Sequence, residues 1–565
     1  MSVFSRDPLR ILFAALAIAF TVAARAASPP AAAVVSAHPL ATAAGREVLE
    51  AGGNAFDAAV AVTAALAVVE PFDSGLGGGG FFLLHQAEGD KDAVIDAREQ
   101  APLAATPKMY LDERGEVIPK LSLDGPLAAG IPGTPAALDH LARCYGKLGL
   151  ARDLAPAERL AREGFETGAA YQRLAGIRRE TLRNSPAAAG IFLNMGEAPA
   201  PGFRLVQPEL ADTLAGLAKD GARFFYSGPF ANKLVQGVRN AGGIWQKEDL
   251  AAYRIIERRP LYGSYNGIEV VSVPPPSSGG VVLIEMLNML EHFDLNRLDA
   301  ITRKHVIVEV MRRAYRDRAQ FLGDPAFAPV PTDQFIDKPY AQTLAAGIDL
   351  HRATPSDALS SDKTQATGTH TTHFSIIDAE GNVVAATLSL NYPFGSGFIP
   401  PGTGVLLNDE MDDFASKPGA PNAYGLVGGT ANQIEPGKRP LSSMTPTILR
   451  TPDRVAALGT PGGSRIISMV LLGVLDFAGG RPPESWVRVP RFHHQYLPDV
   501  IEFEPGALTD IEQAGLKKMG HTLKLLDRTY GNMQALLWDK KSNTVQAVSD
   551  PRGEGRADVF ITPVK

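Results

Sequence analysis

Cysteine is almost absent from this 565-residue chain, in which Cys144 is the only one. A single cysteine cannot form a disulfide within the chain, so burial of apolar side chains has to hold the fold together, which a chain of this length can achieve. The sequence around Cys144, LARCYGKLG, has too little positive charge to activate a thiol strongly. We therefore expect Cys144 to be a small buried side chain rather than a nucleophile.

An excess of basic residues is also missing. The 55 lysines and arginines are outnumbered by 61 aspartates and glutamates, for a formal net charge of −6, which argues against binding to nucleic acid. The composition, with 45% hydrophobic and 21% charged residues, is that of an ordinary globular protein.

The apolar run at residues 11–24 is too short to span a bilayer comfortably. It follows Arg6 and Arg10 and leads into ARA at 24–26, which is the pattern of a secretory signal peptide cut after Ala26. The sequence therefore predicts an exported protein, periplasmic or extracellular, without a membrane segment after residues 1–26 are removed. An uncleaved anchor is the alternative.

Two common ligand sites lack their signatures. The glycine run SGLGGGGFFLL (74–84) has no Gly-Lys-Ser/Thr after it and leads into a strand, so we expect close backbone contacts rather than phosphate binding. His370 and His373 are three apart in a predicted strand and point to opposite faces, and the adjacent His493 and His494 have the same difficulty as metal ligands. We predict no metal and no cofactor.

Helical patterns dominate the first part of the chain. One helix breaks at Gly52-Gly53 and resumes over about 54–69, and the region from about 135 to 345 is mostly helical, with breaks at proline and glycine. Strands dominate after about residue 371. The polar segment 356–370 between these regions has no apolar periodicity and ends at TGTHTTHFSII (367–377), as a processing site or an ordinary surface loop would.

Thr371 is the candidate nucleophile. If the bond between His370 and Thr371 is cut, one residue carries both a hydroxyl and a free α-amine, whose reference pKa is ~7.7–8.0. The neutral amine can accept the hydroxyl proton and activate the oxygen for acyl attack. Alternation along the strand puts Thr371, His373 and Ser375 on one face, and the return strand brings Ser389 roughly opposite Thr371, in a register uncertain by one residue.

Ten stretches, in this order and spacing, resemble the γ-glutamyltranspeptidases, a family of N-terminal-nucleophile hydrolases. They cover nearly all of the chain after residue 26 and read AGGNAFDAAVA, GLGGGGFFLL, DAREQAP, GIPGTPAAL, TTHFSIID, LNDEMDDF, PGKRPLSSMTPTI, GTPGGSRII, PRFHHQYLPD and DPRGEG. The resemblance implies an α+β fold, a four-layer αββα sandwich. It also implies autocleavage into a large subunit, 27–370, and a small subunit, 371–565, which are two parts of one fold.

The resemblance assigns a donor pocket to residues whose chemistry suits it. Arg98 would grip the α-carboxylate of a γ-glutamyl group with two hydrogen bonds, as arginine does well, with the hydroxyls of Ser442 and Ser443. Glu410, Asp413 and Asn391 would hold the α-ammonium. The acidic stretch DEMDD lacks the spacing of a calcium loop, and a solvated acidic turn is the alternative for it.

Further roles follow from the same resemblance. Gly462 and Gly463 match backbone donors to the oxyanion, and Ser389 matches a hydroxyl that supports the nucleophile, where many relatives have threonine. The segment 416–429 resembles a lid loop, with Tyr424 as its gating side chain.

The implied activity is that of a γ-glutamyltransferase and glutathione hydrolase. An ester on Thr371 would pass the γ-glutamyl group to water or to an amino acid or peptide amine. The partners are then small molecules and the two subunits of one precursor. The alternatives are a related acylase, acting on cephalosporins, glutaryl compounds or poly-γ-glutamate, and an exported binding protein that does not turn over.

Overall fold

The computed structural model describes residues 28–359 and 371–562, except residues 418, 420, 421, 424 and 427. Its α-helices are α2 (Pro39–Glu50), α3 (Ala55–Val69), α4 (Thr134–Cys144), α5 (Leu150–Glu163), α6 (Ala169–Arg183), α7 (Pro186–Phe192), α8 (Pro208–Asp220), α9 (Ala222–Tyr226), α10 (Gly228–Asn240), α11 (Lys247–Ala252), α12 (Gly279–Leu290), α13 (Ala300–Phe321), α14 (Thr332–Phe335), α15 (Lys338–Ala346), α16 (Ile466–Ala478), α17 (Pro483–Arg488) and α18 (Asp510–Lys518).

Two sheets form the centre of the molecule. The seven-stranded sheet has the order β18 (Arg556–Phe560), β1 (Ala32–Ser36), β9 (Thr372–Ile377), β10 (Val383–Ser389), β2 (Gly79–Gln86), β3 (Lys91–Asp96) and β6 (Ile256–Arg258). The six-stranded sheet has the order β17 (Thr544–Ser549), β16 (Gln534–Asp539), β12 (Arg454–Gly459), β11 (Thr447–Arg450), β8 (Ile268–Ser272) and β7 (Leu261–Tyr265). Two smaller sheets contain β13 (Phe492–His493), β14 (Ile501–Phe503) and β15 (Leu523–Leu525), and β4 (Phe165–Glu166) and β5 (Arg204–Leu205).

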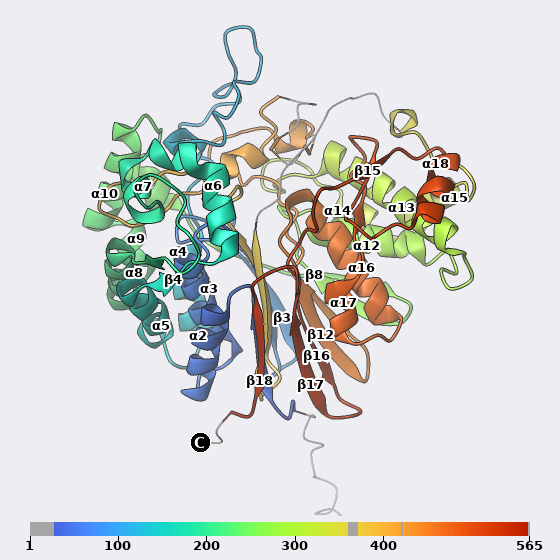
Figure 1. Ribbon diagram of the computed structural model, residues 1–565, viewed down its shortest axis with the longest axis horizontal. Coiled ribbons are helices and arrows are strands. Elements are labelled where there is room, and N and C mark those ends of the chain that lie inside the picture. Colours follow the sequence, from blue (N-terminus) through green and yellow to red (C-terminus); the bar gives the residue numbers. More distant parts are fainter. Residues whose placement is uncertain are drawn as a thin grey trace, which may run out of the picture.

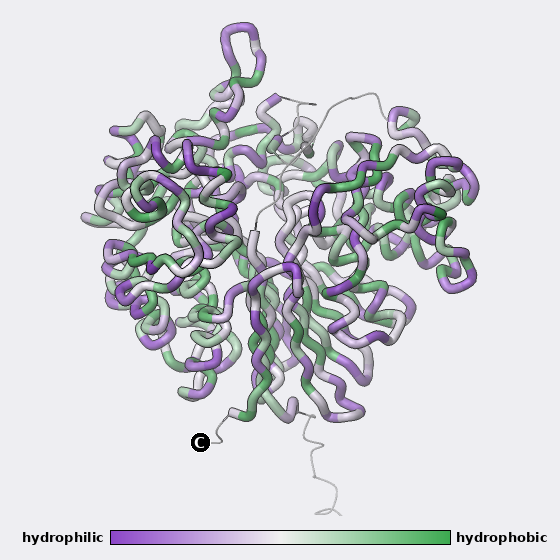
Figure 2. Tube along the Cα trace, viewed as in Figure 1, coloured by the Kyte–Doolittle hydropathy of each residue, from purple (hydrophilic) through white to green (hydrophobic). Residues whose placement is uncertain are grey.

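Helices cover the outer face of each large sheet (Figure 1). The core beneath α2, α3, α5 and α8 lies on the seven-stranded sheet, the core beneath α12, α13 and α16 lies on the six-stranded sheet, and a third apolar cluster lies between the sheets. Figure 2 shows the apolar residues gathered along the central strands and the hydrophilic ones towards the periphery. These are four layers, αββα, and the predicted α+β sandwich is confirmed.

The break in the first helix is where the glycines predict it, because α2 ends at Glu50 and α3 begins at Ala55. Asn54 caps α3, since its side chain accepts hydrogen bonds from two backbone N–H groups of the first turn. The region after residue 135 is less purely helical than expected. Strands β6, β7 and β8 interrupt it and complete the edges of both sheets, and α16, α17 and α18 lie among the later strands.

The glycine run makes close backbone contacts, as predicted. A Cβ atom on Gly77 would collide with the carbonyl of Leu406, and one on Gly78 with the carbonyl of Ser389. Glycine is therefore needed here so that the chain can pass directly beside the end of β10.

The β9–β10 hairpin has the register that the sequence predicts. Thr387 pairs with His373 and Leu388 with Thr372, so continuing the ladder by one residue places Ser389 opposite Thr371. The odd-numbered side chains of β9 point at the six-stranded sheet, where the ring of His373 lies directly over Gly459 of β12. His373 is held there by Thr387 Oγ1, 2.8 Å from Nδ1, and by Ser375 Oγ, 3.1 Å from Nε2.

The expectation for Cys144 is wrong, because its side chain is exposed. Helix α4 buries Ala137, Leu138 and Leu141, but Cys144 is the last residue of the helix and lies beyond its buried stretch. Of the helices described, none combines the length and the apolar character needed to cross a membrane.

We predict that Gly459→Ala destabilises the fold. The added methyl group would lie well under 3.0 Å from the ring of His373, which two hydroxyls hold in place. Overpacking of this kind typically lowers the free energy of unfolding by about 1–3 kcal/mol. Gly176→Ala is the matched control, because a Cβ atom there meets nothing within 4 Å and alanine favours the helix. Urea denaturation compares the two variants, and an unchanged midpoint for Gly459→Ala would contradict this account of the packing between the sheets.

Candidate active site

A small cavity lies between the ends of the two central sheets. It has a volume of about 20 Å³, room for about one water molecule. Nine of the residues predicted from the sequence line it together: Arg98, Thr371, Ser389, Asn391, Glu410, Asp413, Ser442, Ser443 and Gly463. Gly462 lines a neighbouring, larger cavity, which also contains Thr371. His370 and Tyr424 lie outside the described residues.

Thr371 immediately precedes β9 and is 4% exposed. It is the one predicted residue that lines both cavities, so Thr371 lies where the two spaces meet. On the adjacent strand, Ser389 Oγ accepts a hydrogen bond from the backbone N–H of Asn391, 2.7 Å away. Asn391 has a φ of 78°, a left-handed conformation that asparagine tolerates better than most residues, and its side chain donates to the carbonyl of Asp409.

Arg98 is fully buried and, besides a longer ion pair with Glu99 at 3.4 Å, forms ion pairs with two acids of the cavity. Its Nη1 lies 2.5 Å from Glu410 Oε2, and its Nη2 bonds Asp413 Oδ2. Burial acts to lower the pKa of Arg98, but the charges of Glu410, Asp413 and Glu99 raise it, so the guanidinium is fixed in its charged form. Burial raises the pKa of Glu410 well above its usual value, against the opposing effect of Arg98. Arg98, which the resemblance assigns to the carboxylate of a donor, is thus bound here by Glu410 and Asp413, which it assigns to the ammonium.

Ser442 and Ser443 directly follow Pro440 and Leu441, whose carbonyls accept hydrogen bonds from Arg98, and Ser442 forms a β-bridge with Ser277. The carbonyl of Ser442 accepts hydrogen bonds from the N–H and the hydroxyl of Ser278, at 2.8 and 2.6 Å. Ser443 Oγ accepts a hydrogen bond from Nη2 of Arg318, at 3.0 Å. Arg318 belongs to α13, far from every motif of the sequence analysis, and no pattern in the sequence pointed to it.

The loop from β12 to α16 carries the two predicted glycines. Their φ angles, 149° for Gly462 and 54° for Gly463, lie in the region that favours glycine. The loop continues into η5 (Gly463–Arg465) and then into α16. Backbone N–H groups at the beginning of a helix point towards its N-terminus, where they favour a negative charge. This arrangement can stabilise an oxyanion formed next to Thr371.

The larger cavity, about 390 Å³, carries charges that the sequence analysis did not identify. Glu70 accepts a hydrogen bond from Thr372 Oγ1, at 2.8 Å. Burial raises the pKa of Glu70 well above its usual value and that of Asp73 to about 8. Arg173 and Arg528 line the same space, and their mutual repulsion adds to burial in lowering the pKa of Arg173. These residues are scattered along the sequence, which explains why spacing alone did not reveal them.

His373, next to Thr372, is not an acid or a base of this site. Burial lowers its pKa to about 3, so the ring is neutral at any pH near 7. His493 is similar: its pKa is lowered to about 3, chiefly by burial, and it bonds Ser468 and Gln495.

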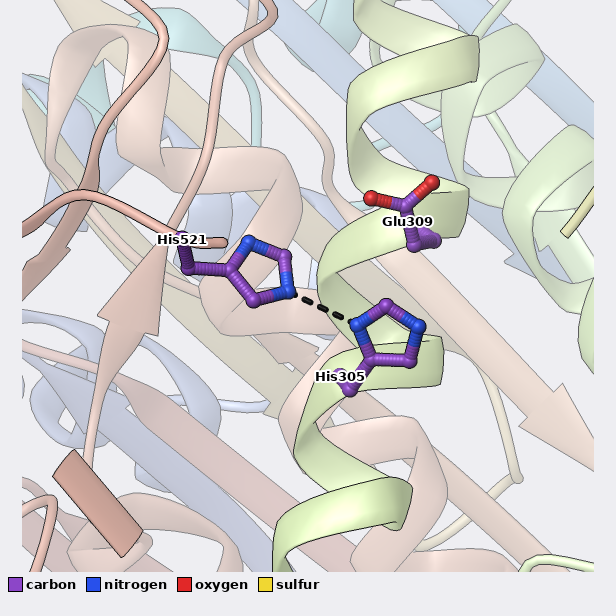
Figure 3. A group of neighbouring side chains, drawn as sticks. All are labelled: His305, Glu309 and His521. Atoms are coloured by element: carbon purple, nitrogen blue, oxygen red, sulfur yellow. Dashed lines mark hydrogen bonds between the residues drawn. The ribbon is translucent and has the colours of Figure 1, made fainter. Parts of the chain in front are cut away.

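Within the described ranges, one group of three side chains could offer ligands to a metal: His305, Glu309 and His521 (Figure 3), whose ligand atoms lie within 4.8 Å of one another. The ring nitrogens His305 Nδ1 and His521 Nε2 are 2.7 Å apart, a hydrogen-bond distance. His305 Nε2 lies 2.7 Å from the carbonyl of Asp349, so it donates, and Nδ1 must accept from His521.

The carboxylate of this group is already neutralised. Glu309 pairs with Arg312 at 3.1 Å and with Arg313 at 2.6 Å. A metal would have to break the bond between the histidines and sit beside two guanidinium groups. We therefore assign the His305–Glu309–His521 group a structural role.

Together these residues provide the parts needed for acyl transfer. A buried threonine, a glycine of the β12–α16 loop and a set of paired opposite charges line one narrow space. Such a pair can open to receive a ligand that itself carries both an anion and a cation, because each buried charge then gains a new partner.

Comparison with known proteins agrees with the geometry. The family described as Gamma-glutamyltranspeptidase matches residues 41–560. The glutathione hydrolase proenzyme of Escherichia coli K12 is 41% identical over 527 residues, covering 92% of this chain and 88% of the relative.

Two solved structures are also similar. The cephalosporin acylase from Bacillus halodurans has a TM-score of 0.82 and 27% identity, over 94% of this chain and 96% of its own. A chain of the Helicobacter pylori γ-glutamyltranspeptidase is 42% identical, with a TM-score of 0.56, over 57% of this chain and 93% of its own. Since the family match covers nearly all of the described residues, the chain belongs to the γ-glutamyltranspeptidase family.

Proposed function

We propose that the protein is a γ-glutamyltransferase and glutathione hydrolase that uses Thr371 as its nucleophile. The observation that carries the proposal is the position of Thr371 between two cavities of different character. One is small and holds paired opposite charges, which suits the amino-acid end of a γ-glutamyl group. The other is larger and suits the amine that leaves or arrives.

Maturation begins with the Thr371 hydroxyl, which attacks the carbonyl carbon of His370. The peptide bond breaks as the ester forms, and the nitrogen of Thr371 gains a proton. Water then hydrolyses the ester, which frees the carboxylate of His370 and restores the hydroxyl of Thr371 beside its free α-amine. Before this cut the nitrogen is an amide and cannot act as a base, so cleavage and activation are one event.

Turnover repeats this chemistry on a γ-glutamyl amide. The neutral α-amine takes the hydroxyl proton while Thr371 Oγ1 attacks the γ-carbonyl, and backbone N–H groups at Gly462 and Gly463 stabilise the oxyanion. Each donor of this kind can contribute ~2.7–4 kcal/mol to the transition state. The amine leaves with a proton, as cysteinylglycine when the donor is glutathione. Water or an acceptor amine then attacks the γ-glutamyl ester and restores Thr371, with Ser389 supporting the nucleophile.

The donor pocket works by exchange of ion-pair partners. The α-carboxylate takes Arg98, Ser442 and Ser443, while the α-ammonium takes Glu410, Asp413 and the side-chain oxygen of Asn391. A zwitterion leaves no buried charge unpaired, whereas a donor with a carboxylate alone would separate Arg98 from its acids without replacing it. Tyr424, in the lid segment, would cover this pocket.

We further propose that residues 1–26 are removed on export to the periplasm or beyond, and that 27–370 and 371–565 remain together as a heterodimer. The sheet order supports the second point, because β9 and β10 of the later segment lie between β1 and β2 of the earlier one. The match to the H. pylori chain also supports a split, since that chain is nearly covered by little more than half of this one.

Cephalosporin or glutaryl acylase activity is the second candidate, favoured by the high structural similarity to an acylase. The acidic partners of Arg98 count against it, because an acyl group without an α-ammonium has no use for Glu410 and Asp413.

Thr371→Ala should give one band on a denaturing gel and no release of anilide from a γ-glutamyl anilide. Wild type should give two bands, the smaller beginning at Thr371 on N-terminal sequencing. Thr372→Ser is the matched control, because serine keeps the hydroxyl that bonds Glu70, and it should process and turn over normally. Turnover by Thr371→Ala, or a small fragment that begins elsewhere, would refute the assignment of the nucleophile.

Asp413→Asn should weaken discrimination between γ-glutamyl and glutaryl anilides. The change keeps an acceptor but removes a buried charge, and truncating a charge pair costs ~2–5 kcal/mol, so kcat/KM for the γ-glutamyl donor should fall about 30-fold or more. The glutaryl donor lacks the ammonium and should lose much less. Glu116→Gln, at an exposed surface ion pair with Lys417, serves as the control for a lost carboxylate. An unchanged ratio of the two kcat/KM values would argue for the acylase alternative.

A further inference from the structure

Arg318 is a buried cation just behind the donor pocket. It lies in the last turn of α13 and is 4% exposed. Among the residues that the structure describes, no carboxylate forms an ion pair with it. Its hydrogen bonds go to two hydroxyls instead: Nε lies 2.9 Å from Ser278 Oγ, and Nη2 lies 3.0 Å from Ser443 Oγ. Burying a cation with only neutral partners is costly, so the position calls for an explanation.

The direction of these hydrogen bonds orients the serine hydroxyls. A guanidinium only donates, so both serine oxygens must accept. Ser278 then gives its own proton to the carbonyl of Ser442, 2.6 Å away. Ser443 lines the cavity, and its proton remains available to a ligand there. Arg318 therefore fixes the Ser442–Ser443 segment from behind and makes the hydroxyl of Ser443 a donor towards the cavity.

The charges around the pocket also favour an anion at Ser443. Arg98 is already compensated by Glu410 and Asp413, whereas Arg318 adds a positive charge that no ion pair cancels. Burial lowers the pKa of Arg318 to about 10, which still leaves it protonated near neutral pH. A carboxylate bound at Ser443 would feel this charge through one hydroxyl, in surroundings from which water is excluded.

We propose that Arg318 is a positioning residue for the α-carboxylate of the donor, acting through the hydroxyl of Ser443. The inference rests on the proposed function, because it presumes a donor with an α-carboxylate in this pocket. The carboxylate is received by Arg98 together with the Arg318–Ser443 pair. No motif of the sequence includes Arg318, and it does not itself line the cavity.

The test compares Arg318→Gln and Arg318→Lys with wild type on a γ-glutamyl anilide and on the same anilide with its α-carboxylate converted to a carboxamide. Loss of a hydrogen bond to a charged group corresponds to about a tenfold effect. We expect KM for the carboxylate substrate to rise about tenfold in Arg318→Gln with kcat within about twofold, and the preference for carboxylate over carboxamide to fall by the same factor.

Arg318→Lys keeps the charge but cannot donate to both serines from a rigid fork, so its effect should be intermediate. It also replaces Arg318→Gln as the test if that variant does not mature. Arg316→Gln is the matched control, because Arg316 lies on the same helix but pairs with Asp317 instead of Ser443. An equal loss for both substrates, or no loss, would overturn the proposal.

A double-mutant cycle isolates the route through Ser443. In a Ser443→Ala background, Arg318→Gln should cost less than about twofold in KM, since the hydroxyl that it positions is already gone. A full tenfold loss in that background would show that Arg318 acts by another route and would refute the inference. A wild-type protein without activity on any γ-glutamyl anilide would instead refute the proposed function.

Discussion

The buried ion cluster of Arg98 with Glu410 and Asp413 is the constraint on which the site depends. Its members come from the end of β3 and from η3 (Glu410–Asp413), more than 300 residues later, so the cluster joins the two segments that cleavage would separate. Three charges in an apolar interior are tolerated only while each has a partner. On the proposed function, the cluster would also select the donor, because a ligand that separates these ion pairs has to supply both signs of charge.

The interleaving of strands supports this arrangement. Strands β9 and β10 lie at the centre of the seven-stranded sheet, between strands that precede residue 100, so a cut before Thr371 would free a chain end without freeing a layer. Strand β9, which would become the N-terminal strand of the small subunit, pairs with β1 on one side and with β10 on the other. A terminus fixed in this way can hold a nucleophile at a defined place, which a flexible chain end could not.

Local features of the site could be predicted from the sequence because short-range rules control them. The hairpin register follows from alternation and a tight turn, and the glycine contacts follow from a missing Cβ atom. The strand pattern placed Thr371 and Ser389, and the family resemblance supplied the other seven predicted residues around the small cavity. Arg318 and the charges at Arg173 and Arg528 were missed because only the packing of segments far apart in the sequence, two helices and a loop, brings them to the site. Cys144 was misjudged because burial depends on how far along α4 the covering layer reaches, and Cys144 is the last residue of that helix.

The similarity to an acylase shows why fold alone cannot decide the substrate. The overall structure matches a cephalosporin acylase with a TM-score of 0.82, yet one scaffold can serve several acyl groups. What distinguishes them is the charge around the acyl end. A pocket with one guanidinium and no acid would suit a simple carboxylate, whereas this pocket places two acids on Arg98 and a second guanidinium behind Ser443. That set balances an α-amino acid, so the electrostatics, rather than the architecture, favour a γ-glutamyl donor.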